Sequence, residues 1–445
     1  MSVDSARLDR DHIWHPFTQQ QGWIEEDPLV IERGEGSHLI DVDGRRYLDG
    51  TASLWCNVHG HRHPKIDRAV HDQLDKIAHS TMLGLTHPGA AELASRLIDI
   101  APPGLSRAFY SDSGSTAAEI ALKMAFQYQR QRGGEHARRT SFVRLRDAYH
   151  GDTIGSVSVG GIDLFHATYR PLLFDTHAAE PGDATHLARI LSVHAERVAA
   201  VIVEPLVQGA AGILVHPPGY LREVRRLCDH HGVLLICDEV ATGFGRTGTM
   251  FACEQEGVSP DLMCLAKGIT GGYLPLAATL TTEEVYEGFL GAPEEQRTFF
   301  HGHTYTGNPL ACAAALANLD VFESERTLLR LQPKVRLLGE LLAEIATMPE
   351  VAQVRGRGFM VGIDLGEHDP ALRMGHRVTI EARRRGAIVR PLGDTVVLVP
   401  PLSISKGDLR RLLEITADSI EAACGRVRPA LAEVPAQPPR LRRAA

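Results

Sequence analysis

Short apolar runs alternate with longer stretches of helical period from about His63 to Asp320, and this alternation constrains the fold more than any other feature. Two of the runs, residues 199–204 and 234–238, have the continuous apolar character of strands buried on both faces of a parallel sheet. Strands that alternate with helices build βαβ units. We therefore predict an α/β fold with a mostly parallel sheet across residues 63–320.

The pattern changes after Asp320. A helix is predicted over 325–348, strands over 358–364 and 395–399, and a last helix over 405–423. Near the start, Asp43-Gly44 lies between alternating residues and predicts a hairpin turn. We therefore expect a large domain at 63–320 and a small α+β domain built from 1–62 and 321–428. The remaining residues, 429–445, are rich in Pro, Arg and Ala and are expected to be disordered.

Composition excludes several classes of protein. The net charge of −8 gives no reason to expect a nucleic-acid partner. No run approaches the ~18 apolar residues that a membrane span needs, and the charged N-terminus does not resemble a signal peptide. The seven cysteines are scattered without a CxxC pair, which is typical of a reducing compartment. We expect a cytoplasmic protein without a membrane partner.

Asp238 and Lys267 carry the strongest chemical signal. Asp238 ends the apolar run 233–238, and Lys267 follows a second run at 261–265 and precedes glycines. An acid at the carboxyl end of a core strand lies where α/β sheets bind ligands. A lysine among apolar residues loses its proton more easily and can form a Schiff base with an aldehyde cofactor. The alternative is a turn-capping aspartate and a surface lysine.

Two further segments are compatible with such a site. Ser113, Gly114 and Ser115 open a predicted helix, where backbone N–H groups and hydroxyls can bind an anion. A plain serine N-cap explains the same residues. Tyr149 follows a predicted strand at 141–145 and can lie over a flat ring, although a tyrosine at a strand end is more often simply packed.

Other motifs allow different functions. Gly243-Phe-Gly-Arg-Thr-Gly248 fits the dinucleotide pattern GxGxxG, but no helix signal follows it and the acid precedes the glycines. His59-Gly-His-Arg-His63 and His301-Gly-His303 have HxH spacing, yet no third metal ligand is evident, so we predict no metal site and favour polar active-site or interface roles. Arg390 lies between two predicted strands, where it can bind a substrate carboxylate or form a surface ion pair.

Taken in order, the segments SDSGS (111–115), YHGD (149–152), DEVATGFGRTG (238–248), AKGITGG (266–272) and HGHTYTGNP (301–309) resemble the class III, fold-type I pyridoxal-phosphate aminotransferases. The resemblance spans nearly the whole chain. It implies a mostly parallel seven-stranded sheet, pyridoxal 5′-phosphate as cofactor, and a homodimer with active sites at the subunit interface. HPFTQ (15–19) and LWCNVHGH (54–61) point to the group that converts 8-amino-7-oxononanoate to 7,8-diaminononanoate in biotin biosynthesis.

The resemblance also implies roles for single residues. Lys267 would hold the cofactor and move the proton, Asp238 would keep the pyridine nitrogen protonated, and Tyr149 would stack on the ring. The other cofactor contacts would be Ser113, Gly114, Ser115, Glu204, Val240 and, for the neighbouring subunit's phosphate, Thr304. The substrates would meet Phe17, Trp55, Tyr149, Asp152, Gly302 and Arg390.

Two departures from the group concern the substrate pocket. Phe17 stands where many members have tyrosine, and Leu54-Trp55 replaces a Trp-Trp pair. The group usually takes its amino group from S-adenosylmethionine, which we expect here, but a branch uses lysine, and losing one hydrogen bond can change donor choice. Another class III ω-aminotransferase, a nicotinamide dehydrogenase and a non-enzymatic dimeric scaffold are the remaining alternatives.

Overall fold

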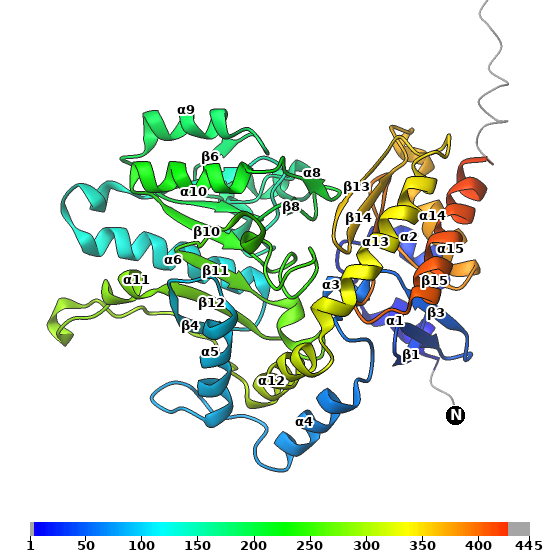
Figure 1. Cartoon of the computed structure of the whole chain (residues 1–445), viewed down its shortest axis with the longest axis horizontal. Coiled ribbons are helices and arrows are strands. Elements are labelled where there is room, and N and C mark those ends of the chain that lie inside the picture. Colours follow the sequence, from blue (N-terminus) through cyan, green and yellow to red (C-terminus); the bar gives the residue numbers. More distant parts are fainter. Residues whose placement is uncertain (1–3, 426–445) are drawn as a thin grey trace, which may run out of the picture.

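The computed structural model describes residues 4–425, which form two lobes (Figure 1). The larger lobe is built on a seven-stranded sheet in the order β4-β12-β11-β10-β7-β5-β6. Only β12 runs antiparallel to its neighbours, so the prediction of a mostly parallel seven-stranded sheet is confirmed. The strands span β4 (Leu105–Ser111), β5 (Ser141–Leu145), β6 (Thr176–Ala179), β7 (Val198–Val203), β10 (Leu234–Asp238), β11 (Leu262–Leu265) and β12 (Ala277–Thr282).

Helices cover both faces of this sheet because its central strands are apolar on both sides. Every residue of β7 and β10 is buried. Ile202 and Ile236 pack with α6, whereas Val201 and Leu235 pack with three helices on the opposite face. Successive side chains of a strand point to opposite faces, so each strand contributes to two cores. The helices are α6 (Gly114–Arg132) on one face and α5 (Pro88–Ile100), α9 (Ala184–His194) and α10 (Tyr220–His231) on the other.

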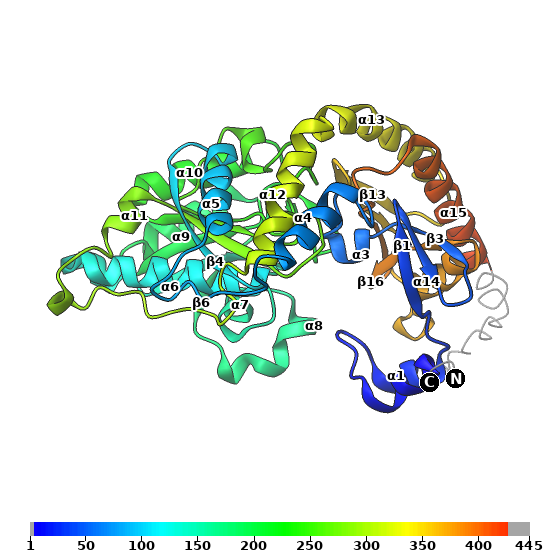
Figure 2. The same cartoon turned by 90° about the horizontal axis from the view of Figure 1, so that it is seen from below.

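The smaller lobe joins the two ends of the described chain (Figure 2). One four-stranded sheet has the order β1-β2-β3-β15, with β15 parallel to β3, and a second has the order β13-β14-β17-β16. The predicted turn at Asp43-Gly44 does connect β2 to β3. The strands are β1 (Ile31–Glu35), β2 (His38–Asp41), β3 (Arg46–Asp49), β13 (Gln353–Arg357), β14 (Met360–Asp364), β15 (Ala387–Ile388), β16 (Arg390–Leu392) and β17 (Thr395–Leu398).

The three longest helices of the smaller lobe, among the described residues, are α13, α14 and α15, and α12 leads into this lobe. Their bounds are α12 (Pro309–Ser324), α13 (Thr327–Ile345), α14 (Met374–Arg384) and α15 (Lys406–Gly425). Shorter elements are α1 (Ser5–His12), α2 (Gln20–Glu25), α3 (Ala52–Trp55), α4 (Pro64–Leu74), α7 (Ile154–Ser158), α8 (Asp163–His166), α11 (Glu283–Glu287), β8 (Val207–Gln208) and β9 (Leu214–Val215). The tail expected to be disordered, 429–445, lies outside the described residues. No helix among residues 4–425 is long and apolar enough to cross a membrane.

The loop Gly243–Gly248, which matches the dinucleotide pattern, joins the lobes. Arg246 is only 2% exposed, and its guanidinium donates to the carbonyl of Pro400 at 2.6 Å and to that of Asn57 at 2.5 Å. The Arg246 carbonyl in turn accepts from the N–H of Phe359. The next regular element after the loop is a short 3-10 helix, Cys253–Glu256. The glycines therefore serve tight packing between lobes rather than the strand–loop–helix geometry of a dinucleotide site.

Candidate active site

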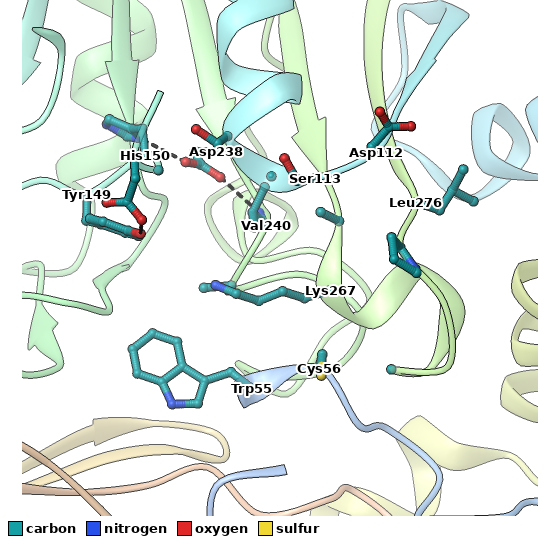
Figure 3. A pocket seen from close by; sticks show the side chains of 18 of the residues that line it. Trp55, Cys56, Asp112, Ser113, Tyr149, His150, Asp238, Val240, Lys267 and Leu276 are labelled. Carbon is teal, nitrogen blue, oxygen red and sulfur yellow. Dashed lines mark hydrogen bonds and ion pairs between the residues drawn. The ribbon is translucent and has the colours of Figure 1, made fainter. Parts of the chain in front are cut away.

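A cavity of about 730 Å³ opens at the carboxyl ends of the parallel strands (Figure 3). Its lining comes from the segments that follow β4, β5, β7, β10 and β11, and from Trp55 and Cys56 of the N-terminal segment. This edge is where open α/β sheets bind ligands, since the loops there leave a crevice. The prediction that Asp238 and Lys267 converge on one site is consistent with this lining.

Lys267 follows β11 and has a left-handed backbone conformation, with φ of 46°. Its amine faces the cavity but is enclosed by protein, and this burial lowers the pKa of the lysine, while Asp238 and Glu204 partly oppose the change. The Nζ atom lies 5.1 Å from the centre of the Trp55 ring. Lys267 is therefore an amine that loses its proton more easily than a surface lysine.

Asp238 ends β10 and is held by two donors. Its Oδ2 atom lies 2.6 Å from Nδ1 of His150, and its Oδ1 atom accepts from the N–H of Val240 at 3.0 Å. The His150 side chain is fully buried, and its Nε2 atom has no hydrogen-bond partner among residues 4–425. If Nδ1 carries the proton, the imidazole donates to the carboxylate and fixes its orientation. Sequence reasoning did not assign a role to His150.

Glu204 binds the backbone of two segments next to the cavity. Its carboxylate accepts from the N–H of Tyr149 at 3.1 Å and from that of Gly209 at 2.8 Å. Burial raises the pKa of Glu204 to about 7, an effect that His150 opposes and Asp238 reinforces. The Tyr149 hydroxyl donates to Asp152 at 2.7 Å. Glu204 thus fixes the backbone that carries Tyr149, and Asp152 fixes the ring.

The start of α6 borders the cavity. Ser113 is the N-cap, and its hydroxyl and that of Thr116 exchange hydrogen bonds with each other's backbone N–H, so the simple capping interpretation is also correct. The Ser115 hydroxyl lies 2.8 Å from that of Thr153, a residue that sequence reasoning missed. A Cβ atom on Gly114 would lie 2.5 Å from Val240, so only glycine fits there. Ser113, Gly114 and Ser115 line the cavity, and the N-terminus of a helix favours a negative charge.

Ten of the predicted site residues line this cavity. They are Trp55, Ser113, Gly114, Ser115, Tyr149, Asp152, Glu204, Asp238, Val240 and Lys267. Four others do not line it: Phe17, Gly302, Thr304 and Arg390.

Phe17 and Arg390 lie near the cavity through Tyr149. The Phe17 ring meets that of Tyr149 edge-on, with centroids 6.5 Å apart. Arg390 begins β16, and burial lowers the pKa of its guanidinium while Tyr149 opposes the change. No hydrogen bond or ion pair joins this guanidinium to any residue within 4–425, so the surface ion pair considered for it is absent there.

Gly302 and Thr304 are exposed on the surface, outside the cavity of their own chain. No group of three or more His, Cys, Asp or Glu side chains suited to a metal is found around their neighbours His301 and His303 or elsewhere in the described part of the chain. The Nε2 atoms of the two rings instead lie 3.0 Å apart, as in a shared hydrogen bond.

Comparisons with known proteins agree with this geometry. The family model "Aminotransferase class-III" matches residues 22–420. The chain is 57% identical over 439 residues to adenosylmethionine-8-amino-7-oxononanoate aminotransferase of Nitratidesulfovibrio vulgaris, covering 93% of this chain and 81% of the relative. The crystal structure of the protein of that name from Methanocaldococcus jannaschii superposes with a TM-score of 0.92 at 44% identity, covering 94% of this chain and 98% of that one. A PLP-bound amine transaminase from an uncultivated Pseudomonas species gives a TM-score of 0.86 at 38% identity, covering 93% and 98%.

Proposed function

Because the chain belongs to the class-III aminotransferases, we propose that it transfers an amino group to 8-amino-7-oxononanoate and so forms 7,8-diaminononanoate in biotin biosynthesis. The observation that carries the proposal is the convergence of Asp238, Lys267 and the start of α6 on one cavity. Relatives that bear this activity in their names are 42–57% identical over more than nine tenths of the chain.

The residues of the cavity fit pyridoxal 5′-phosphate, the cofactor of the family. When bound, this cofactor withdraws electrons from the substrate carbon that loses its proton. The first turn of α6, with Ser113, Gly114 and Ser115, would hold the phosphate. Tyr149 and Val240 would cover the two faces of the ring, and Glu204 would support Tyr149 from behind.

Asp238 and Lys267 would be the residues that hold and transfer protons in the reaction. The Asp238 carboxylate, oriented by His150 and by the Val240 N–H, would hold a proton on the ring nitrogen of the cofactor. Lys267 would bind the cofactor covalently and then, as a free amine, remove the proton from the donor and return it to the acceptor. Its lowered pKa suits this exchange, because a general base must be unprotonated at working pH.

Arg390 would bind the carboxylate of the keto acid. A half-buried guanidinium without a partner in residues 4–425 carries an unused set of five donors that matches a carboxylate. Trp55, Tyr149, Asp152 and Phe17 would form the walls of the substrate pocket. For the donor we propose S-adenosylmethionine, with lysine as the alternative because Phe17 lacks the hydroxyl of a tyrosine.

A homodimer would complete the site with Gly302 and Thr304 of the second subunit. These residues lie in an exposed stretch beside Phe300, which is 82% exposed, and Tyr305. Tyr305 packs on His79 with ring centroids 4.8 Å apart, and Leu83, four residues after His79 in the chain, is 90% exposed. Such a concentration of exposed apolar side chains is typical of a protein interface.

The division into a large domain, 63–320, and a small domain built from 1–62 and 321–428 remains a proposal that the two lobes support. A cytoplasmic location is likewise proposed, because no disulfide occurs among residues 4–425, which include all seven cysteines.

The test is the visible absorbance of the purified protein with bound cofactor, before and after S-adenosylmethionine or lysine is added separately. We expect the band to change with S-adenosylmethionine, and product assays to detect 7,8-diaminononanoate once the keto acid is supplied. A change with lysine alone would move the donor assignment and leave the reaction unchanged. A band that responds to neither donor, with turnover of other ω-amino compounds, would assign the chain to another aminotransferase of the class. Lys267→Ala should abolish turnover, and near-normal activity in that variant would refute the assignment.

A further inference from the structure

Residues 297–304 form an extended segment with two different faces. Arg297, Phe299, His301 and His303 are half-buried, whereas Thr298, Phe300, Gly302 and Thr304 are exposed. Alternation with a period of two is what an extended backbone produces when it docks on one side only. The segment therefore has an inner face that packs on its own chain and an outer face that carries Thr304.

The inner face docks along α6. Gln127 and Gln131, one helical turn apart, both donate to the carbonyl of Arg297, at 3.3 and 3.1 Å. One turn earlier, the amine of Lys123 lies 5.6 Å from the centre of the Phe299 ring. Phe299 also packs edge-on against Phe109 of β4, with centroids 5.5 Å apart. Lys123, Gln127 and Gln131, which form one stripe along α6, thus contact the inner face of the segment.

Two hydrogen bonds and one histidine–carboxylate contact run in series from this stripe back to the start of α6. Lys123 Nζ lies 2.9 Å from His301 Nδ1, the Nε2 atoms of His301 and His303 lie 3.0 Å apart, and His303 Nδ1 lies 3.2 Å from Asp112 Oδ2. Asp112 immediately precedes Ser113, the N-cap of α6.

The donor and acceptor at the two ends fix the protons between them. The Lys123 ammonium only donates, so Nδ1 of His301 accepts and its Nε2 carries a hydrogen. Nε2 of His303 then accepts, which places the ring hydrogen of His303 on Nδ1, the atom that lies 3.2 Å from Asp112 Oδ2. Burial together with the charge of Lys123 lowers the pKa of His301, which suits a ring that accepts at Nδ1.

The outer face leaves Thr304 available. Its side chain is exposed, and no hydrogen bond joins its hydroxyl to another residue of the described chain. The turn that follows is closed by Thr306, whose hydroxyl donates to the carbonyl of His303 at 2.8 Å and accepts from its N–H at 3.1 Å. His303 is therefore fixed on both its backbone and its side chain, next to a threonine that binds nothing in its own subunit.

We infer that His301 and His303 are positioning residues that tie the segment presenting Thr304 to the start of α6, so that each subunit's phosphate site is linked to the residue it offers to its partner. The inference rests on the proposed homodimer. Breaking this series of contacts then weakens cofactor binding in the opposite subunit, although neither histidine lines the cavity.

The first test measures the dissociation constant of pyridoxal 5′-phosphate for His303→Ala and for Lys123→Met, which leaves both histidines in place. We expect binding to weaken about tenfold, the effect of losing a hydrogen bond worth about 1.4 kcal/mol. His303→Asn keeps a donor for Asp112 but cannot also reach His301. Its affinity for the cofactor should therefore lie between that of His303→Ala and that of the unchanged protein. His230→Ala, on α10, is the matched control and should bind the cofactor as the unchanged protein does.

The decisive test uses mixed dimers isolated with two different affinity tags. In one, a Lys267→Ala/His303→Ala chain accompanies an unchanged chain, so the only complete cofactor site depends on the altered partner. In the other, Lys267→Ala accompanies His303→Ala, so the altered chain carries the complete site and its partner is normal at His303.

Weakened binding at the complete site of the first dimer supports the inference. If cofactor binding weakens only in the second dimer, the histidines act within their own subunit, and the inference is overturned. If it weakens in neither dimer, the histidines have no effect on cofactor binding, and the inference is overturned as well. Failure to isolate any mixed dimer, together with a monomeric mass by light scattering, would refute the homodimer of the proposed function instead.

Discussion

Nδ1 of His150 lies 2.6 Å from Oδ2 of Asp238, and both side chains are buried at the carboxyl ends of strands on either side of β7. This contact holds the carboxylate in one orientation. A carboxylate that loses this partner is free to rotate, and its oxygen atoms then no longer point in a fixed direction into the cavity.

We therefore expect His150→Phe to lower kcat by about tenfold or more, because one charge-assisted hydrogen bond is lost. His150→Asn should recover part of the activity, since its amide can still donate to Asp238. Steady-state kinetics across pH with both variants would check this. Equal losses in the two variants would contradict a positioning role and indicate a requirement for the ring itself.

Arg390 gives a prediction that separates the two substrates. Arg390→Ala should raise KM for the keto acid about 10- to 100-fold, the value of losing hydrogen bonds to a charged group, and change KM for the amino donor much less. Arg390→Lys retains the charge without the paired donors and should fall between. Comparable changes for both substrates would argue against a carboxylate contact at this position.

The buried histidines His59 and His216 predict a loss of stability in acid. Burial lowers the pKa of each to about 4, whereas in the unfolded chain it is about 6.5. Between these values the unfolded chain binds protons that the folded protein does not, so stability is complete above about pH 6.5 and falls toward pH 4, by about 3 kcal/mol per histidine.

Urea unfolding of the cofactor-saturated protein at pH 7, 6, 5 and 4 would measure this loss. His59→Leu should reduce the dependence on pH, whereas His71→Gln, at an exposed position of α4, should leave it unchanged. An identical pH dependence in His59→Leu and the unchanged protein would show that His59 is not responsible.

Arg246, which does not line the cavity, predicts a large effect on stability. Arg246→Met preserves the length of the side chain but leaves the carbonyls of Asn57 and Pro400 without a donor, which should lower the free energy of unfolding by about 3 kcal/mol. Arg330→Met, on the exposed side of α13, is the control. Denaturant unfolding followed by fluorescence would compare them, and coincident curves would contradict the role of Arg246 as the joint between lobes.

The parts of the site that sequence predicts are those fixed by local pattern. Continuous apolar runs identify β7 and β10 because both faces of these strands are buried, and so they place Asp238 at the ligand-binding edge. The serine-rich start of α6 is recognisable for the same reason, since capping residues mark a helix before any tertiary contact exists.

Contacts between segments that are distant in the sequence cannot be predicted from local sequence patterns. His150 meets Asp238 across an intervening strand, which depends on how far β5 and β10 extend relative to each other. The left-handed backbone of Lys267 leaves no signal in residue types, because lysine rarely adopts it. At Gly243–Gly248 the sequence matches the dinucleotide pattern GxGxxG although the loop has another role. The burial of Arg246 indicates that the loop packs between the two lobes.

The pairing of β15 with β3 has a consequence for the synthesis of the chain. The partner strand of β3 begins at Ala387, about 340 residues after β3 ends. At ~5–20 residues per second, the ribosome delivers it roughly 17–70 s later. During that interval one edge of β3 has no partner, and unpaired strand edges promote association between chains. Yield in a heterologous host should therefore depend on translation speed and chaperone supply more than on the stability of the finished protein.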